Sequence, residues 1–103
     1  MTHMKVELID NSATILLPEL FDYYLIKNFI SNSQQFSECD SIVIDFKDTK
    51  YIDSPAIATL FRLRQIVKER DCVKIINIRR NLYELLVMTG YVGLLGENNF
   101  LVK

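Results

Sequence analysis

Three carboxylates, Asp45, Asp48 and Asp53, lie close together directly after an apolar, β-branched segment of the sequence. Ligands of open α/β sheets bind at the carboxyl ends of the strands. Such carboxylates could therefore hold Mg²⁺ for phosphoryl transfer, with Asp45 as an aspartyl-phosphate acceptor and Asp48 as its neighbour. A fold built for that reaction needs more strand–helix units than this chain offers. We keep a phosphoryl-transfer enzyme only as an alternative hypothesis.

The triplet Asp53-Ser54-Pro55 predicts the start of a helix. Ser54 is placed as the N-cap, where its hydroxyl would accept a hydrogen bond from the N–H of Ala56 or Ile57. Pro55 suits the first helical position, because the N–H that it lacks would be unpaired there. The same position exposes the Ser54 hydroxyl to a kinase. A phosphate would add about −1.5 to −2 charges beside Asp53, which a helix N-terminus stabilises but a docked partner does not.

The sequence shows no other catalytic arrangement. The single histidine, His3, lies in residues 1–3, which we expect to be a disordered terminus or residues ahead of a natural start at Met4. Cys39 and Cys72 have neither C-x-x-C spacing nor a histidine companion, so we expect two free thiols. The three glycines form no phosphate-binding loop. We therefore expect a protein that is not an enzyme and that has no metal or cofactor.

Length and composition fit one small folded domain spanning residues 1–103. With 50% hydrophobic and 24% charged residues, the chain can bury a core and is not of the disordered class. The apolar runs are far shorter than the roughly 20 residues that cross a bilayer. No leader segment opens the sequence. We expect a soluble, cytoplasmic protein without membrane insertion.

The net charge of −1 is unevenly distributed along the chain. Residues 1–53 carry 9 acidic and 4 basic side chains, whereas residues 54–103 carry 4 acidic and 8 basic ones. Most of the basic side chains fall between residues 62 and 80. A solvated helix face explains this stripe, and an acidic protein partner is the next interpretation. We expect no direct nucleic-acid partner, because the sequence pI is about 5.8.

Residue patterns in the first half predict a hairpin, a helix and a strand. Alternating apolar residues over 4–9 and 13–17, separated by a turn-rich triplet, predict two antiparallel strands. Helical spacing predicts one amphipathic helix from Pro18 to the polar stretch after residue 30. The apolar, β-branched run over 41–46 predicts the central strand of a sheet.

The second half alternates between helices and strands. After a polar loop, the pattern predicts a helix over 54–70, a strand over 72–78 and a helix over 81–89 that Gly90 terminates. A short strand over 100–102 could close the sheet. This alternation predicts parallel pairing with right-handed crossovers. The fold class is therefore α/β with an added N-terminal β-hairpin.

Two segments resemble the signature of STAS domains, the anti-sigma factor antagonist family. Residues 42–46 and 49–60 are similar to an apolar strand ending in Asp, a short loop and a (I/V/M)-D-S-S-G-L motif that leads into a helix. Residues 85–91 are similar to a leucine-rich helix followed by Thr-Gly. The resemblance extends over about residues 4–102. It implies a mixed central sheet with an N-terminal β-hairpin and with helices packed mainly on one face.

The resemblance also implies a function. In this family the serine matched by Ser54 is phosphorylated by a GHKL-type serine kinase, which is itself the anti-sigma factor or partner-switch kinase, and Asp53 matches the acidic residue before it. The unphosphorylated domain binds that partner, and a PP2C-type phosphatase restores this form. A regulator of transcription or signalling is therefore implied. The sequence departs from the motif at Pro55, which replaces a small residue, and at Ala56, which replaces a glycine.

We expect the partner to dock on the start of the second predicted helix and along its exposed face. The residues expected to contribute are Asp53, Ser54, Pro55, Ala56, Ile57, Arg62, Gln65 and Glu69. The alternative is a STAS subunit that supports a membrane transporter complex from the cytoplasmic side. Such a subunit would use the same surface without phosphorylation.

Overall fold

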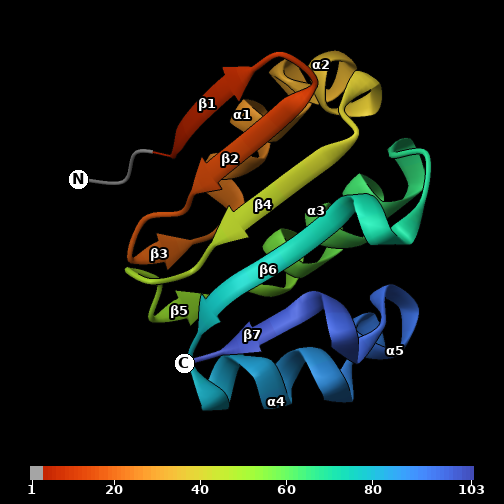
Figure 1. Ribbon diagram of the computed structural model, residues 1–103. Helices are drawn as coiled ribbons and strands as arrows, with labels where there is room; N and C mark the ends of the chain where they lie inside the picture. The colour runs from red at the N-terminus through yellow and green to blue at the C-terminus, as the bar shows by residue number, and fades with distance from the viewer. Residues whose placement is uncertain (1–3) are drawn as a thin grey trace.

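The computed structural model describes residues 4–103, and the expectation for residues 1–3 lies outside this range. Its centre is a five-stranded sheet of order β1-β2-β4-β6-β7 (Figure 1). The strands are β1 (Lys5–Ile9), β2 (Ser12–Leu16), β4 (Ser41–Asp45), β6 (Val73–Ile78) and β7 (Phe100–Val102). Strands β1 and β2 are antiparallel, and the other neighbours are parallel. The expected mixed sheet with β4 at its centre is confirmed.

The N-terminal hairpin is confirmed as well. Strand β1 pairs with β2 along its whole length, and Asp10 and Asn11 form the turn between them. Asp10 has φ 54°, in the left-handed region that Asp and Asn tolerate better than most residues. The Asn11 carbonyl accepts a hydrogen bond from the N–H of Asp40 at 2.7 Å. This bond ties the hairpin turn to the segment that enters β4.

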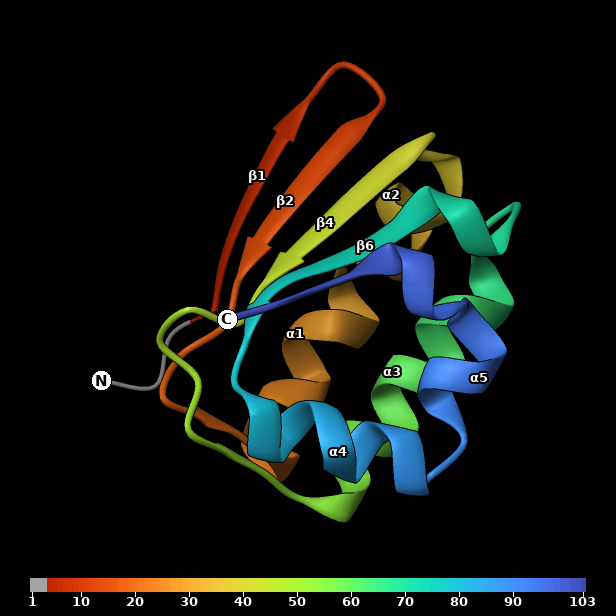
Figure 2. The same cartoon turned by 60° about the horizontal axis from the view of Figure 1, so that its bottom comes forward.

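The helices lie on one side of the sheet (Figure 2). They are η1 (Tyr23–Leu25), α1 (Ile26–Ser31), α2 (Ser33–Glu38), α3 (Ser54–Ile66), η2 (Arg70–Cys72), α4 (Arg80–Met88), α5 (Tyr91–Leu95) and η3 (Glu97–Asn99). In β4, Ile42 and Ile44 are fully buried, while the alternate residues are half-buried. This alternation fits a sheet with one covered face, as expected. Across residues 4–103, no helix is both long and apolar enough to cross a bilayer.

The first part of the predicted helix over 18–30 is wrong. Leu20–Phe21 form a short strand, β3, which pairs in parallel with β5 (Tyr51–Ile52). The carbonyl of Pro18 accepts a hydrogen bond from the Thr49 hydroxyl at 2.9 Å, and Thr49 is itself fully buried. These contacts keep the segment between Pro18 and η1 extended. Helical spacing failed here because a partner segment far along the chain decides the conformation.

Two helices that the sequence pattern did not predict and one helix end also differ from expectation. Helix α2 lies in the polar stretch where we expected no helix, and it buries only Phe36. Helix α3 ends at Ile66, before Arg70, because Val67 is extended and turns its side chain into the core. Gly90 ends α4 with φ 88°, as predicted. Beyond it, Tyr91 and other buried side chains begin the unpredicted helix α5.

Aromatic side chains connect the helical layer to the sheet. Phe21 in β3 contacts Phe29 in α1 and Phe46 after β4, with ring centroids 5.5 and 6.4 Å apart. Phe29 in turn contacts Phe36 in α2 at 6.0 Å. All four rings belong to the buried core. Burial of these large rings is a main source of stability for the α1–α2 layer.

Tyr91 combines good packing with an unsatisfied hydroxyl. Its ring is fully buried and meets Phe61 and Phe100 edge-on, at centroid distances of 5.2 and 6.2 Å. Within residues 4–103 its hydroxyl has no hydrogen-bond partner. Burial raises the pKa of Tyr91 well above its ordinary value, and Arg64 partly opposes this rise. The ring therefore stabilises the fold, whereas the hydroxyl does not.

We expect Tyr91→Phe to raise the free energy of unfolding by about 1 kcal/mol near neutral pH, because it removes an unpaired buried hydroxyl. Above pH 10, Tyr91 of the unsubstituted protein loses its proton readily only when the chain is unfolded, since burial raises the pKa of Tyr91 in the folded state. The native protein should therefore lose about 1.4 kcal/mol by pH 11 through this group, and the variant should not. Urea unfolding of both proteins at pH 8 and pH 11 measures the difference. A difference in stability that stays constant with pH would contradict the prediction.

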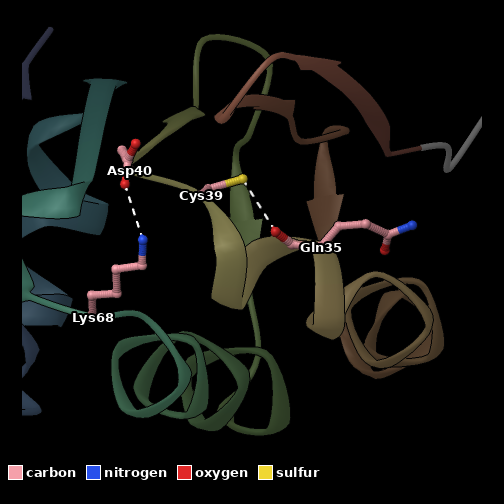
Figure 3. A network of polar contacts seen from close by, with 4 residues as sticks. All are labelled: Gln35, Cys39, Asp40 and Lys68. Atoms are coloured by element: carbon pink, nitrogen blue, oxygen red, sulfur yellow. Dashed lines mark hydrogen bonds and ion pairs between the residues drawn. The ribbon is translucent and has the colours of Figure 1, made fainter.

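Cys39 is a free thiol at the entrance to β4 (Figure 3). It is buried, and its thiol donates a hydrogen bond to the Gln35 carbonyl at 3.2 Å. The adjacent Asp40 forms an ion pair with Lys68 at 3.1 Å. Burial raises the pKa of the Cys39 thiol, as do the carboxylates of Asp40 and Glu38, while Lys68 lowers it. Cys39 should therefore stay protonated and unreactive.

Cys72, the other free thiol, is half-buried and should react first with a thiol reagent. We expect it to react at least about tenfold faster than Cys39, because the thiolate is the reactive form. Labelling of the Cys39→Ser and Cys72→Ser variants with a disulfide reagent at pH 8 measures each thiol alone. Equal rates for the two variants would contradict the assignment.

Candidate functional site

Helix α3 begins at an aspartate cap, and this corrects the prediction for Ser54. Asp53 has extended backbone angles, φ −100° and ψ 173°, and its Oδ1 accepts a hydrogen bond from the N–H of Ala56 at 2.9 Å. Its carbonyl accepts one from the N–H of Ile57 at 3.1 Å. Asp53 is therefore the N-cap, Ser54 is the first residue of the helix and Pro55 is the second. Both aspartate and serine cap helices well, so the local sequence could not choose between them.

The second carboxylate oxygen of Asp53 joins α3 to a distant part of the chain. Oδ2 accepts a hydrogen bond from the N–H of Tyr23 at 2.9 Å. The N–H of Asp53 donates to the Phe21 carbonyl at 3.3 Å, directly beyond the β3–β5 pairing. One side chain thus caps α3 and also fixes the turn from β3 into η1. The start of α3, which carries Ser54, is therefore fixed both by its own cap and by the segment that leads from β3 into η1.

Ser54 has a hydroxyl that the fold does not use. The residue is exposed, and within residues 4–103 its side chain makes no hydrogen bond. Pro55 is exposed beside it, whereas Ala56 is fully buried and Ile57 is half-buried. Ala56 therefore anchors the first turn in the core while Ser54 and Pro55 face solvent. A hydroxyl in this position can accept a phosphoryl group, and the helix N-terminus favours the resulting anion.

Ser54 continues into an exposed stripe along α3, which we call the α3 stripe. It consists of Ser54, Ala58, Arg62 and Gln65, all of which are exposed and spaced at three or four residues. Arg62 lies about 12 Å from Ser54 along the helix axis. Glu69 lies beyond the end of α3, next to η2, so the prediction that it belongs to the helix face is wrong.

Exposed apolar side chains next to the site were missed in the sequence. Tyr23 and Tyr51 are 63% and 61% exposed, and Leu20 is 39% exposed. Leu20 and Tyr51 pair with each other across the β3–β5 ribbon. Tyr23 donates its N–H to the α3 cap. Tyrosines of this exposure are typical anchors of protein interfaces. No local signal placed Tyr23 at the cap of α3, because that contact accompanies the β3–β5 pairing.

Asp45 and Asp48 do not join Asp53 in a metal site. Asp45 Oδ1 accepts hydrogen bonds from the N–H of Lys47 at 2.9 Å and from the Asn77 side-chain amide at 3.0 Å. Asp48 is exposed in the following loop. In the part of the chain that the structure describes, no three His, Cys, Asp or Glu residues are grouped to hold a metal ion. Asp45 instead links the ends of β4 and β6.

A family model for the STAS domain matches residues 6–100. The chain belongs to the STAS domain family. The predicted family is thereby confirmed, and STAS domains are regulatory or binding modules. No curated protein matches the sequence.

Solved structures confirm the STAS fold. SpoIIAA, a Bacillus cell fate determinant solved in its phosphorylated form, matches with a TM-score of 0.74 and 9% identity, over 98% of this chain and 91% of that chain. A sulfate transporter family protein from Wolinella succinogenes matches with a TM-score of 0.77 and 13% identity, over 92% and 80%. An anti-sigma factor antagonist from Mycobacterium paratuberculosis matches with a TM-score of 0.74 and 11% identity, over 91% and 82%. At these identities the likeness shows the fold alone.

Proposed function

We propose that this STAS domain is a cytoplasmic partner-switching regulator. Its unphosphorylated form binds a GHKL-type serine kinase or anti-sigma factor, and phosphorylation of Ser54 releases that partner. The observation that carries the proposal is the exposed Ser54 hydroxyl, which is left unused because Asp53 caps α3. SpoIIAA, which has the same fold, has been solved both with and without phosphorylation.

The surroundings of Ser54 suit a switchable docking surface. Exposed Tyr51 lies in β5 just before Ser54, exposed Tyr23 lies in η1 and donates its N–H to the Asp53 cap, and Arg62 and Gln65 follow on the α3 stripe. A partner bound here would cover Ser54 and remove it from water. A phosphate in a contact that offers it no cation is costly to bury. Phosphorylation should therefore weaken docking without unfolding the domain.

The proposed reaction needs no catalytic group from this chain. The kinase transfers the γ-phosphoryl group of ATP to Ser54 Oγ, so that a P–O bond to Oγ forms and the bond to the β-phosphate oxygen breaks. ADP leaves and the hydroxyl proton passes to the kinase or to solvent. A PP2C-type phosphatase reverses the modification with water, which restores the hydroxyl and releases inorganic phosphate. The STAS domain acts as substrate and ligand, not as an enzyme.

Mass spectrometry of tryptic peptides tests the assignment. After incubation with the kinase of its own genome and ATP, the peptide that contains Ser54 should gain one phosphate. Ser54→Ala should abolish the modification. Thr59→Val is the matched control, because Thr59 lies on the same helix with its hydroxyl donating to the Pro55 carbonyl at 3.0 Å. Modification that persists in Ser54→Ala would contradict the proposal.

A second candidate is supported by the transporter-related structures. The STAS domain of a SulP transporter from Vibrio cholerae matches with a TM-score of 0.68 and 18% identity, in addition to the Wolinella protein. On that hypothesis the same surface docks on a membrane transporter complex from the cytoplasmic side, without phosphorylation. Co-purification of a transporter with both the native protein and Ser54→Glu would favour this candidate over the switch.

A further inference from the structure

A cavity of about 330 Å³ lies between α1, α2 and α3. Its walls are mainly apolar and come from Ile26, Phe29, Phe36, Leu63 and Ile66. The rings of Phe29 and Phe36 are buried and contact each other in this wall, with their centroids 6.0 Å apart. The volume falls at the lower end of the range typical of small-molecule sites, roughly 300–1,000 Å³.

Arg62 supplies a positive charge at this cavity. It lines the space together with the hydroxyl residues Ser33 and Thr59, and within residues 4–103 it forms no ion pair. Thr59 already donates its hydroxyl to the Pro55 carbonyl. The exposed guanidinium of Arg62 therefore has its hydrogen-bonding capacity available for a ligand.

Among residues 4–103, no acidic side chain lines the cavity beside Arg62. Helices α1 and α3 contain no Asp or Glu, and α1 adds a further cation, Lys27. The one acid of α2 is Glu38, at the end of that helix, where it lines a separate, smaller hollow beside the β1–β2 turn. The cavity thus joins apolar walls to an uncompensated positive charge.

We propose that this cavity binds a medium-chain carboxylic acid. The hydrocarbon chain would lie against the apolar walls, and the carboxylate would be held by the guanidinium of Arg62. Arginine is suited to this role because its planar fork can donate two parallel hydrogen bonds to one carboxylate. The site is independent of the Ser54 hydroxyl and goes beyond the proposed switch.

Isothermal titration calorimetry with hexanoate, octanoate and decanoate, each below its micellar concentration, tests the proposal. Affinity should rise about fourfold for each added methylene group until the cavity is full. Octyltrimethylammonium and octanol should bind at least about tenfold more weakly than octanoate, because neither offers an anion to Arg62. Equal binding of the three head groups would overturn the proposal.

Two variants locate the ligand. Arg62→Gln should reduce the affinity for octanoate at least about tenfold, whereas Arg80→Gln should leave it unchanged, because Arg80 lies on α4 over the Tyr83 ring and outside the cavity. Ile26→Trp should fill the cavity and abolish binding. Unchanged affinity in Arg62→Gln would overturn the proposal. So would self-association of the native protein, measured by light scattering, that Ile26→Trp abolishes, because a second copy would then be the occupant.

Discussion

Replacing Asp53 with alanine is expected to lower the free energy of unfolding by about 2–3 kcal/mol. The variant loses the cap on the Ala56 N–H and the charged acceptor for the Tyr23 N–H, both at 2.9 Å in the native protein. A cap contributes about 1 kcal/mol, and the solvent-exposed hydrogen bond to the charged Asp53 contributes about 1.5 kcal/mol, the lower end of the range for such bonds. For a domain of this size the melting temperature should fall by roughly 10–20 °C.

Three further variants separate the two roles of Asp53. Asp53→Asn keeps an oxygen for the cap but replaces the other oxygen with an amide that cannot accept from Tyr23, so its stability should be intermediate. Ser54→Ala should change stability by less than about 0.5 kcal/mol, because Ser54 caps nothing. Asp48→Ala is the charge-matched control, since Asp48 is exposed in the preceding loop, between β4 and β5. A larger loss in Ser54→Ala than in Asp53→Ala would make Ser54 the cap and contradict the structure.

The same two residues illustrate what the sequence could and could not establish. Hydrophobic patterns located the hairpin, the central strand and the helices α3 and α4. When one face of an element is buried, apolar residues recur with the period of a strand or a helix, and this period is visible in the sequence. The capping motif Asp53-Ser54-Pro55 located the start of α3 to within one residue. The motif could not decide whether Asp53 or Ser54 accepts the Ala56 N–H, since both side chains suit the position.

The parts that the sequence did not predict depend on distant partners. Strand β3 exists because the segment after Pro18 pairs with the loop before α3, and helical spacing in that segment gave the opposite prediction. Tyr23, 30 residues before Asp53, reaches the cap of α3 through this pairing. Helix α5 follows Gly90 because its buried side chains, led by Tyr91, complete the core beside α3. Short elements of this kind have little local signal.

The change from an acidic to a basic half of the chain falls at the start of α3. The acidic first half ends at Asp53, and the basic second half begins with the helix that carries Arg62 and Arg64. Helix α3 itself contains no acidic residue. A phosphate on Ser54 would therefore place a negative group at the start of a wholly cationic helix. This change is local, and it alters the docking surface more than the core.

Ser54→Glu is expected to reduce affinity for the kinase partner by about 30- to 150-fold relative to Ser54→Ala. The physical reason is that a carboxylate buried in the contact without a cation costs about 2–3 kcal/mol. Ser54→Gln is the matched neutral variant, because it has nearly the same shape without the charge. Surface plasmon resonance with immobilised kinase, with and without ATP, measures all three variants.

The comparison between Ser54→Glu and Ser54→Gln decides whether the switch is electrostatic. If charge is responsible, Ser54→Gln should bind within about fivefold of Ser54→Ala, and the difference between Glu and Gln should shrink as salt is raised from 50 to 500 mM, to the extent that water reaches the contact. If bulk at the first helical residue is responsible, both variants should lose affinity equally. Thermal unfolding should show all three variants folded, because position 54 takes no part in the cap or the core. A loss of binding in Ser54→Glu can then be attributed to the contact itself, since the domain that makes it is unchanged.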